Sequence, residues 1–273
     1  MTAEAAPHPF ELIAWYAEAG VTEALDETPH DHFAEAPPEP AARAAAPQQT
    51  RALPAQRPAA PVRAMPAAAT TPDEAQVSAL ALAREATSLD ELKAAMARFE
   101  SCALKATAKS LVFADGHPAG RLMLVGEAPG AEEDRLGLPF VGKSGQLLDR
   151  MLAAIGLTRA EHVYITNLLP WRPPGNRTPT PQEVAICMPF VQRHIQLVNP
   201  DILVCVGAPS AQALLGLTGI LASRGKWMEY DTGARKIRAM ATLHPAYLLR
   251  QPLQKRLAWR DLRALKAALE AGG

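Results

Sequence analysis

The sequence predicts an α/β domain of three layers, in which helices cover both faces of a central, mostly parallel, four-stranded sheet. Two observations support this fold class. After residue 120, four short and almost continuously apolar segments recur, which is typical of strands buried on both faces. Segments with helical periodicity separate them, as in βαβ units. The chain has 273 residues, of which 48% are hydrophobic, so it can bury a substantial core.

The first 72 residues differ in composition from the α/β domain, which we place at residues 73–273. Residues 1–33 are acidic, and apolar residues at helical spacing between Phe10 and Leu25 predict a short amphipathic helix. Residues 34–72 are rich in Ala and Pro and predict a disordered linker, because such a segment buries too little apolar surface to offset its ordering entropy. A protein partner could bind the N-terminal segment, but no motif in it names one.

Several features favour a protein of the cytoplasm, which we expect to be a monomer. Residues 1–40 hold nine Asp or Glu and no Lys or Arg, the opposite of the basic start of a signal peptide. The three cysteines are too few and too scattered for a disulfide framework. No apolar run approaches the roughly 18 to 20 residues that a membrane span needs.

Helix and strand signals follow one another from residue 71 onward. Thr71 to Glu74 has the composition of a capping box with Pro at the first helical position, and Ser88 to Glu91 repeats the signal for a helix that runs toward Phe99. Further along the chain, the predicted strands are residues 121–125, 162–166, 201–206 and 236–243, and the predicted helices are residues 145–155, 181–198 and 210–215.

Chemically distinctive residues directly follow the four predicted strands. Glu127 comes after the first strand, Asn167 after the second, Gly207 after the third and His244 after the fourth. In open α/β sheets, ligands bind beyond the carboxyl ends of the strands. The sequence therefore predicts a functional site at this edge of the sheet.

An acidic loop and a basic C-terminal region leave several interpretations open. Residues 126–134 carry four carboxylates, which form either a solvated strand-to-helix turn or a site; a Mg²⁺-dependent nucleotide-phosphate hydrolase is a third interpretation that needs metal. Residues 224–263 hold ten Lys or Arg against three Asp or Glu, a net charge of 10 − 3 = +7. This excess favours a face that binds phosphates, although solvated basic helices would have the same composition.

Six motifs in a fixed order make the chain resemble the family 4 uracil-DNA glycosylases over roughly residues 95–265. The motifs are Gly126-Glu127-Ala128-Pro129-Gly130 with Glu133, Gly137-Leu138-Pro139-Phe140-Val141-Gly142, Ser144-Gly145-Gln146-Leu147-Leu148, Ile165-Thr166-Asn167, Arg172 to Arg177, and His244-Pro245-Ala246-Tyr247-Leu248-Leu249-Arg250. The resemblance implies an enzyme that flips deoxyuridine out of single- or double-stranded DNA, hydrolyses the N-glycosidic bond and leaves an abasic site. A catalytically weak binder of uracil or abasic DNA is the alternative.

The resemblance also implies roles for individual residues in the predicted site. Phe140 stacks under the flipped uracil, and Asn167 recognises its edge with one donor and one acceptor. His244 donates a hydrogen bond to the charge that develops on uracil O2. Glu127 and Glu133 stabilise the sugar cation and orient or activate water, and the sequence does not decide which of them activates it.

Contacts with DNA are assigned by the same resemblance. Leu248 and Leu249 are the predicted wedge residues that fill the space left by the flipped base, and Arg250 holds a phosphate. Arg172 and Arg177, from the fifth motif, are further predicted DNA contacts.

The resemblance also raises the question of a cofactor, because family 4 enzymes ligate an iron–sulfur cluster through four cysteines. Cys102 and Cys187 fall at two of the ligand positions, but Phe99 and Trp171 occupy the other two. Cys205 lies within a predicted core strand and is a poor substitute. Two thiolates do not hold a cubane cluster, so we expect neither a cluster nor another metal.

Overall fold

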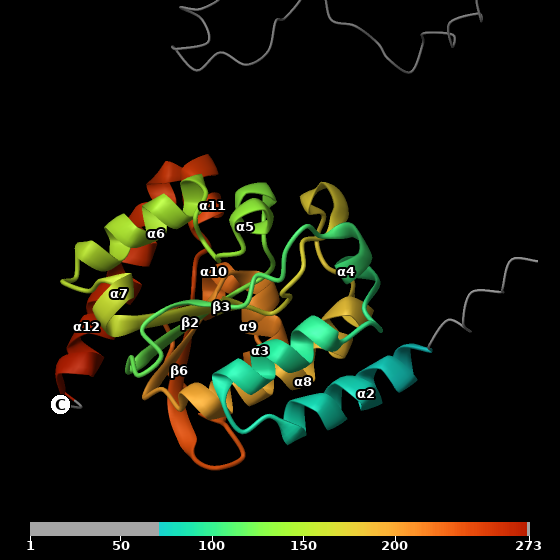
Figure 1. Cartoon of the computed structure of the whole chain (residues 1–273). Coiled ribbons are helices and arrows are strands. Elements are labelled where there is room, and N and C mark those ends of the chain that lie inside the picture. The colour runs from blue at the N-terminus through green and yellow to red at the C-terminus, as the bar shows by residue number, and fades with distance from the viewer. Residues whose placement is uncertain (1–70, 272–273) are drawn as a thin grey trace, which may run out of the picture. The chain divides into compact units, whose positions relative to one another are not determined.

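The structure is a computed structural model that describes residues 71–271 (Figure 1). The predicted N-terminal helix and nearly all of the predicted linker lie outside the described residues. The helices are α2 (Pro72–Glu85), α3 (Leu89–Arg98), α4 (Ala103–Thr107), α5 (Ala131–Leu136), α6 (Lys143–Ala153), α7 (Arg159–His162), α8 (Pro181–Val198), α9 (Ala208–Leu215), α10 (Ile220–Ser223), α11 (Pro245–Arg250) and α12 (Lys255–Ala271), with 3₁₀ turns η1 (Pro174–Asn176) and η2 (Pro252–Gln254). The strands are β1 (Asp115–Gly116), β2 (Leu122–Gly126), β3 (Val163–Asn167), β4 (Ile202–Val206), β5 (Met228–Asp231) and β6 (Lys236–Thr242).

The sheet has six strands in the order β1-β3-β2-β4-β6-β5. The four predicted strands are its parallel centre, β3-β2-β4-β6, which confirms the predicted mostly parallel sheet. The predicted number of four strands is wrong, because β1 and β5 add an antiparallel strand at each edge. β1 has only two residues, and the side chains of β5 alternate between half-buried and exposed, so neither carries the continuous apolar pattern of the central strands.

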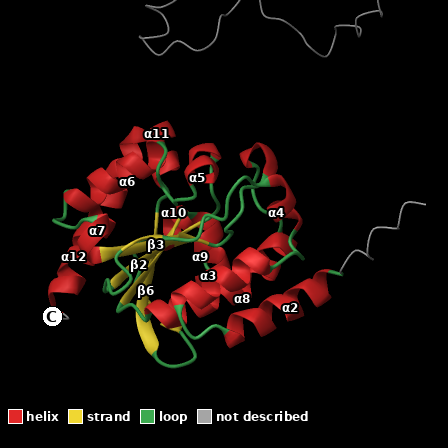
Figure 2. Ribbon diagram, viewed as in Figure 1, coloured by secondary structure: helices red, strands yellow, loops and turns green. Residues whose placement is uncertain are grey.

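Helices cover both faces of the sheet, as the three-layer prediction requires (Figure 2). In β2, Met123 and Val125 join the apolar core beneath α2, α3 and α8, whereas Leu122 and Leu124 join the core beneath α6 and α12. This division follows from the alternation of side chains along a strand. Both cores are therefore continuous with the strands that end at the predicted site.

Side-chain caps fix the starts of three helices where the sequence predicts them. Thr71 and Glu74 form a reciprocal capping box at α2, and Ser88 accepts the backbone N–H of Glu91 at α3. Thr180 and Glu183 form a second capping box at α8. These caps satisfy N–H groups that have no partner within the helix.

The register of the central strands brings their carboxyl ends to one edge. Gly126 pairs with Asn167 at the ends of β2 and β3, and Val206 pairs with Thr242 at the ends of β4 and β6. Four residues separate β2 from α5, and two residues separate β6 from α11. None of the helices between residues 71 and 271 is long and apolar enough to cross a lipid bilayer.

Candidate active site

A cleft of about 610 Å³ opens at the carboxyl edge of the parallel strands. It brings together segments that are far apart in the sequence: the loop after β2, the end of β3, and the residues after β4 and β6. The sequence-predicted residues that line the cleft are Glu127, Glu133, Phe140, Asn167, Arg177, His244 and Arg250. Arg172, Leu248 and Leu249 are not among the lining residues.

Asn167 and Phe140 lie at the inner end of the cleft, each with 5% of its surface exposed. Their position depends on Gly126, because a Cβ atom there would lie 2.4 Å from Asn167 Oδ1 and 2.6 Å from the Phe140 ring. Among residues 71–271, the Asn167 carboxamide has no hydrogen-bond partner, which leaves its oxygen and its NH₂ group available to a ligand. A carboxamide can accept one hydrogen bond and donate another to the same planar base.

His244 is held in one orientation and one protonation state. Its Nδ1 accepts the backbone N–H of Ala246 at 3.1 Å, so the ring proton lies on Nε2, which can donate. Burial, and then the positive charge of Arg250, lower the pKa of His244 to about 4, so the imidazole is neutral at pH 7. Its ring centroid lies 5.5 Å from that of Phe140, at an interplanar angle of 29°. Gly207 admits this arrangement, because a Cβ there would lie 3.1 Å from His244 Cβ.

The two predicted carboxylates have different environments. Glu127 is half-buried in the cleft wall, its carboxylate has no hydrogen-bond partner within residues 71–271, and burial raises its pKa. Glu133 is 8% exposed. Glu133 Oε1 accepts the N–H groups of Val141 and Gly142 at 3.0 and 2.9 Å, and Oε2 accepts that of Gly130 at 3.2 Å. The Glu133 carboxylate is thus occupied by the backbone, whereas that of Glu127 is available to substrate or water.

Several residues that shape the cleft were not among the site residues predicted from the sequence. Tyr247 and Leu221 line it, and Leu221 is 53% exposed, which is unusual for a large apolar side chain. Arg159, in α7, contacts the backbone of Pro139 and Phe140 from outside the cleft. Tyr247 lies inside the last motif, which is a sequence signal for its place; no local pattern marks Arg159 or Leu221.

The sequence profile of the uracil DNA glycosylase superfamily matches residues 113–263, more than half of the chain. The chain belongs to the uracil DNA glycosylase superfamily. It is 41% identical over 170 residues to the type-4 uracil-DNA glycosylase of Archaeoglobus fulgidus, which covers 60% of this chain and 85% of the relative. The type-4 enzymes of Thermotoga maritima and Pyrobaculum aerophilum are 37% identical over 177 residues and 36% identical over 179 residues, covering 63% and 64% of this chain and 90% and 91% of the relatives. The resemblance to family 4 is confirmed.

In this superfamily member, the predicted DNA contacts differ in accessibility. Leu248 is 1% exposed and packs in an apolar core with Leu147 and Leu243, a buried position that does not support its predicted role as a wedge. Leu249 is 41% exposed and remains available. Arg250 is exposed at the rim of the cleft.

The two arginines of the fifth motif are bound to neighbouring side chains. Arg177 forms a bidentate ion pair with Glu183, at 2.6 and 2.8 Å, which lowers the pKa of Glu183 to about 2. Arg172 Nε donates to Asn176 Oδ1 at 2.7 Å. Both interactions orient the guanidinium groups, and Arg177 lines the cleft while Arg172 does not.

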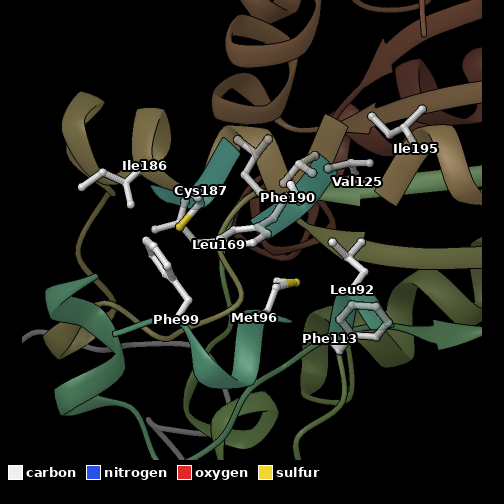
Figure 3. Packing of buried hydrophobic residues seen from close by; sticks show 14 of the residues in the cluster. Leu92, Met96, Phe99, Phe113, Val125, Leu169, Ile186, Cys187, Phe190 and Ile195 are labelled. Carbon is white, nitrogen blue, oxygen red and sulfur yellow. The ribbon is translucent and has the colours of Figure 1, made fainter. Parts of the chain in front are cut away.

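The residues at the expected cluster position do not fit a cluster held by four cysteines. Phe99 and Trp171 are 1% and 2% exposed, and their rings stack with centroids 6.4 Å apart. Figure 3 shows Phe99 and Cys187 in the same apolar core as Phe190, whose ring lies 5.2 Å from that of Phe99. A hydrogen bond with Cys102 and burial raise the pKa of the Cys187 thiol, which favours its protonated form. No group of three or more His, Cys, Asp or Glu within residues 71–271 could hold a metal ion.

Proposed function

We propose that this protein is a uracil-DNA glycosylase that removes uracil from DNA by hydrolysis and leaves an abasic site. One observation carries the proposal: in a member of this superfamily, a single cleft holds an aromatic ring, a neutral imidazole donor, and a carboxamide and a carboxylate that have no hydrogen-bond partner among the described residues. These four groups are what recognition of a planar base and cleavage of its glycosidic bond require.

Asn167 and Phe140 are the proposed base-recognition residues. The Asn167 carboxamide accepts the N3–H of uracil and donates to O4, whereas cytosine presents an unprotonated N3 and an amino group at these places. A site built for this pattern leaves buried polar groups unpaired when cytosine enters, which disfavours cytosine strongly. The Phe140 ring, which lines the cleft, offers an apolar face for stacking.

His244 and Glu127 are the proposed catalytic residues. When the bond between uracil N1 and the sugar C1′ breaks, the bonding electron pair leaves with uracil and the sugar becomes an oxocarbenium ion. Nε2–H of His244 donates to uracil O2 and stabilises the developing anion. The Glu127 carboxylate stabilises the cation and takes a proton from the water whose oxygen joins C1′. The uracil anion then takes up a proton, so charge and atoms balance.

Glu133 has a supporting part in this proposal. Its carboxylate already accepts three backbone N–H groups, so it orders the acidic loop and the segment that carries Phe140. The structure therefore favours Glu127 over Glu133 as the group that activates water.

Leu249 and Arg250 are the proposed DNA contacts of α11. Flipping a nucleotide costs about a few kcal/mol of stacking and pairing, which a wedge side chain and phosphate contacts offset. Leu249 is an exposed apolar residue of α11, and its neighbour Arg250 lines the cleft. Arg172 and Arg177 would position the strand on the side of η1.

We also propose that the enzyme works without an iron–sulfur cluster. The support is the identity and packing of Phe99 and Trp171, which fill two of the four expected ligand positions with rings. Iron and sulfide analysis of the purified protein, together with its visible absorption spectrum, tests this proposal. We expect neither iron nor visible absorbance; a brown protein with about four irons per chain would refute the proposal.

The proposed organisation places activity in residues 73–273 and leaves residues 1–72 as a tether for a partner. We propose that this enzyme acts as a monomer in the cytoplasm. Light scattering of the full chain tests the oligomeric state, and a mass near twice 29.2 kDa would refute a monomer.

Uracil release from an oligonucleotide with one deoxyuridine, detected as strand cleavage after alkali, tests the proposed function. We expect multiple turnover in EDTA and no cleavage of the matched thymidine oligonucleotide. His244→Ala should abolish turnover, whereas the control His117→Ala, at an exposed histidine outside the cleft, should retain it. Stoichiometric binding of uracil-DNA without cleavage would refute the enzyme and support the weak binder.

A further inference from the structure

The segment that carries Phe140 has a backbone conformation that needs support from its surroundings. We name residues 139–142 the Phe140 loop. Phe140 has φ = 53°, in the left-handed region that bulky non-glycine residues rarely adopt. Such conformations persist only where neighbouring contacts determine them, and they cluster at functional sites.

Two charged side chains hold the Phe140 loop from opposite sides. Glu133 accepts the two N–H groups that follow Phe140, as described above. Arg159 binds the carbonyl groups instead: Nη1 donates to the oxygen of Pro139 at 2.8 Å and Nη2 to the oxygen of Phe140 at 2.7 Å. An anion therefore pairs with the donors of the loop and a cation pairs with its acceptors.

Close packing adds to this restraint. A Cβ at Gly145, in the first turn of α6, would lie 1.7 Å from the carbonyl oxygen of Phe140, so the helix backbone passes directly against the loop. The Phe140 ring lies against Gly126 and is stacked with the ring of His244. The ring thus has little room to move while the loop backbone is fixed.

Arg159 is itself fixed by two carboxylates. Its side chain is 15% exposed, and its guanidinium pairs with Asp115 at 2.8 Å and with Asp149 at 2.9 and 3.1 Å. Arg159 does not line the cleft, so it has no route to the base except through the loop. Lysine could not replace it, because the planar fork of arginine reaches two carbonyls at once.

We propose that Arg159 is a positioning residue for base recognition, which holds the ring of Phe140 where a flipped uracil stacks. This inference rests on the proposed function, because stacking against uracil is the role given there to the ring. It names a contribution from α7, a helix outside all the motifs that mark the cleft in the sequence.

Kinetics of Arg159→Met test the inference. Small misplacement of a recognition group lowers turnover by up to about a hundredfold, so we expect kcat on uracil-DNA to fall roughly 10- to 100-fold. KM should change less than threefold, since phosphate contacts dominate DNA affinity and Arg159 makes none in the cleft. Asp149→Asn is the matched control: it removes one negative charge beside the same guanidinium, but the Asn Oδ1 can still accept both hydrogen bonds that hold Arg159, so kcat should stay within twofold of wild type.

A double-mutant cycle separates positioning from general stability. If Arg159 acts through the ring, Arg159→Met should cost less than threefold in a Phe140→Ala background, because the group it positions is gone. Equal losses in both backgrounds would overturn the inference. Arg159→Lys covers the case in which the methionine variant does not fold, and we expect an intermediate kcat; wild-type kcat would overturn the inference.

Hydrogen exchange tests the same inference without relying on activity. The N–H groups of Val141 and Gly142 should exchange at least tenfold faster in Arg159→Met, or in Arg159→Lys if needed, than in Asp149→Asn. Unchanged exchange rates would overturn the inference that Arg159 holds the Phe140 loop, even in an active enzyme. If the wild-type protein does not release uracil, the proposed function is refuted instead. The exchange measurement would still test whether Arg159 holds the Phe140 loop.

Discussion

Glu127 and Glu133 lie six residues apart in one acidic loop, yet replacing each by Gln should affect different properties. Glu127→Gln should abolish most activity and leave stability unchanged. Glu133→Gln should lower stability, and activity should fall as a consequence of a loosened loop. The difference follows from their partners: three backbone N–H groups for Glu133, and none for the Glu127 carboxylate within residues 71–271.

The magnitude for Glu133 can be worked from its three contacts. Hydrogen bonds to a charged group contribute about 1.5–3 kcal/mol each and neutral ones about 0.5–1.5. A Gln at this position keeps at most two of the three bonds, all neutral, because its NH₂ end faces a donor. Because the backbone groups that bind Glu133 are partly exposed, we expect Glu133→Gln to lower the free energy of unfolding by about 3 kcal/mol. This corresponds to a decrease in Tm of roughly 6–12 °C for a domain of this size.

For Glu127→Gln we expect a large loss of rate and almost no change in stability. Burial raises its pKa, so the charged form already gains little from the fold, and Gln should change the free energy of unfolding by less than about 0.5 kcal/mol. Loss of a general base lowers the rate about 10²- to 10⁴-fold. Urea unfolding and single-turnover uracil release measure the two quantities. A Glu133→Gln variant as stable as wild type, or a Glu127→Gln variant with wild-type rate, would refute this reasoning.

Four further predictions concern the cleft, the buried histidines and the chain outside the domain. Asn167→Ala should lower the single-turnover rate about 10²-fold while the urea midpoint stays near that of wild type, because its carboxamide has no partner within residues 71–271. Burial lowers the pKa of His194 to about 3 and that of His244 to about 4, below their unfolded value of 6.5, so stability is fully present above pH 6.5 and is lost as pH falls. The free energy of unfolding in urea should be lower at pH 5 than at pH 7 by about 2 kcal/mol per histidine. In His194→Phe this difference should shrink by about 2 kcal/mol. Leu249→Ala should slow uracil release from duplex DNA about tenfold more than from single strands, and equal effects on both would argue against a wedge. Deleting residues 1–70 should leave kcat/KM on short oligonucleotides within twofold; a collapse would place that segment in the catalytic fold.

Local signals predicted the central sheet and the helix starts well, for physical reasons. The four parallel strands are buried on both faces, so their apolar runs are visible in sequence. The caps at Thr71, Ser88 and Thr180 join residues that are three apart in the sequence, so the sequence pattern is local and easily recognised. The edge strands β1 and β5 escaped prediction because pairing with a neighbouring strand, rather than their own pattern, defines them.

The site was predictable in place but not in detail. Strand ends located Asn167 and His244, because topology alone brings those ends together. Adjacent residues nevertheless have different environments: Leu248 is buried and Leu249 exposed, a difference set by how α11 packs on α6. Arg159 contacts a loop 19 and 20 residues away in sequence, and no local pattern marks such a contact.

The electrostatics of the cleft suit a reaction that separates charge between base and sugar. In the proposed mechanism, the neutral imidazole of His244 and the carboxylate of Glu127, which both line the cleft, stabilise the two charges that develop. Burial is the larger cause of the lowered pKa of His244 and the charge of Arg250 the smaller one. A phosphate bound to Arg250 offsets only the smaller cause, so the imidazole remains neutral when DNA is bound. In the proposed mechanism, His244 therefore keeps its proton on Nε2 in the free enzyme and in the complex, and we expect protonation of Glu127 to end activity as pH falls.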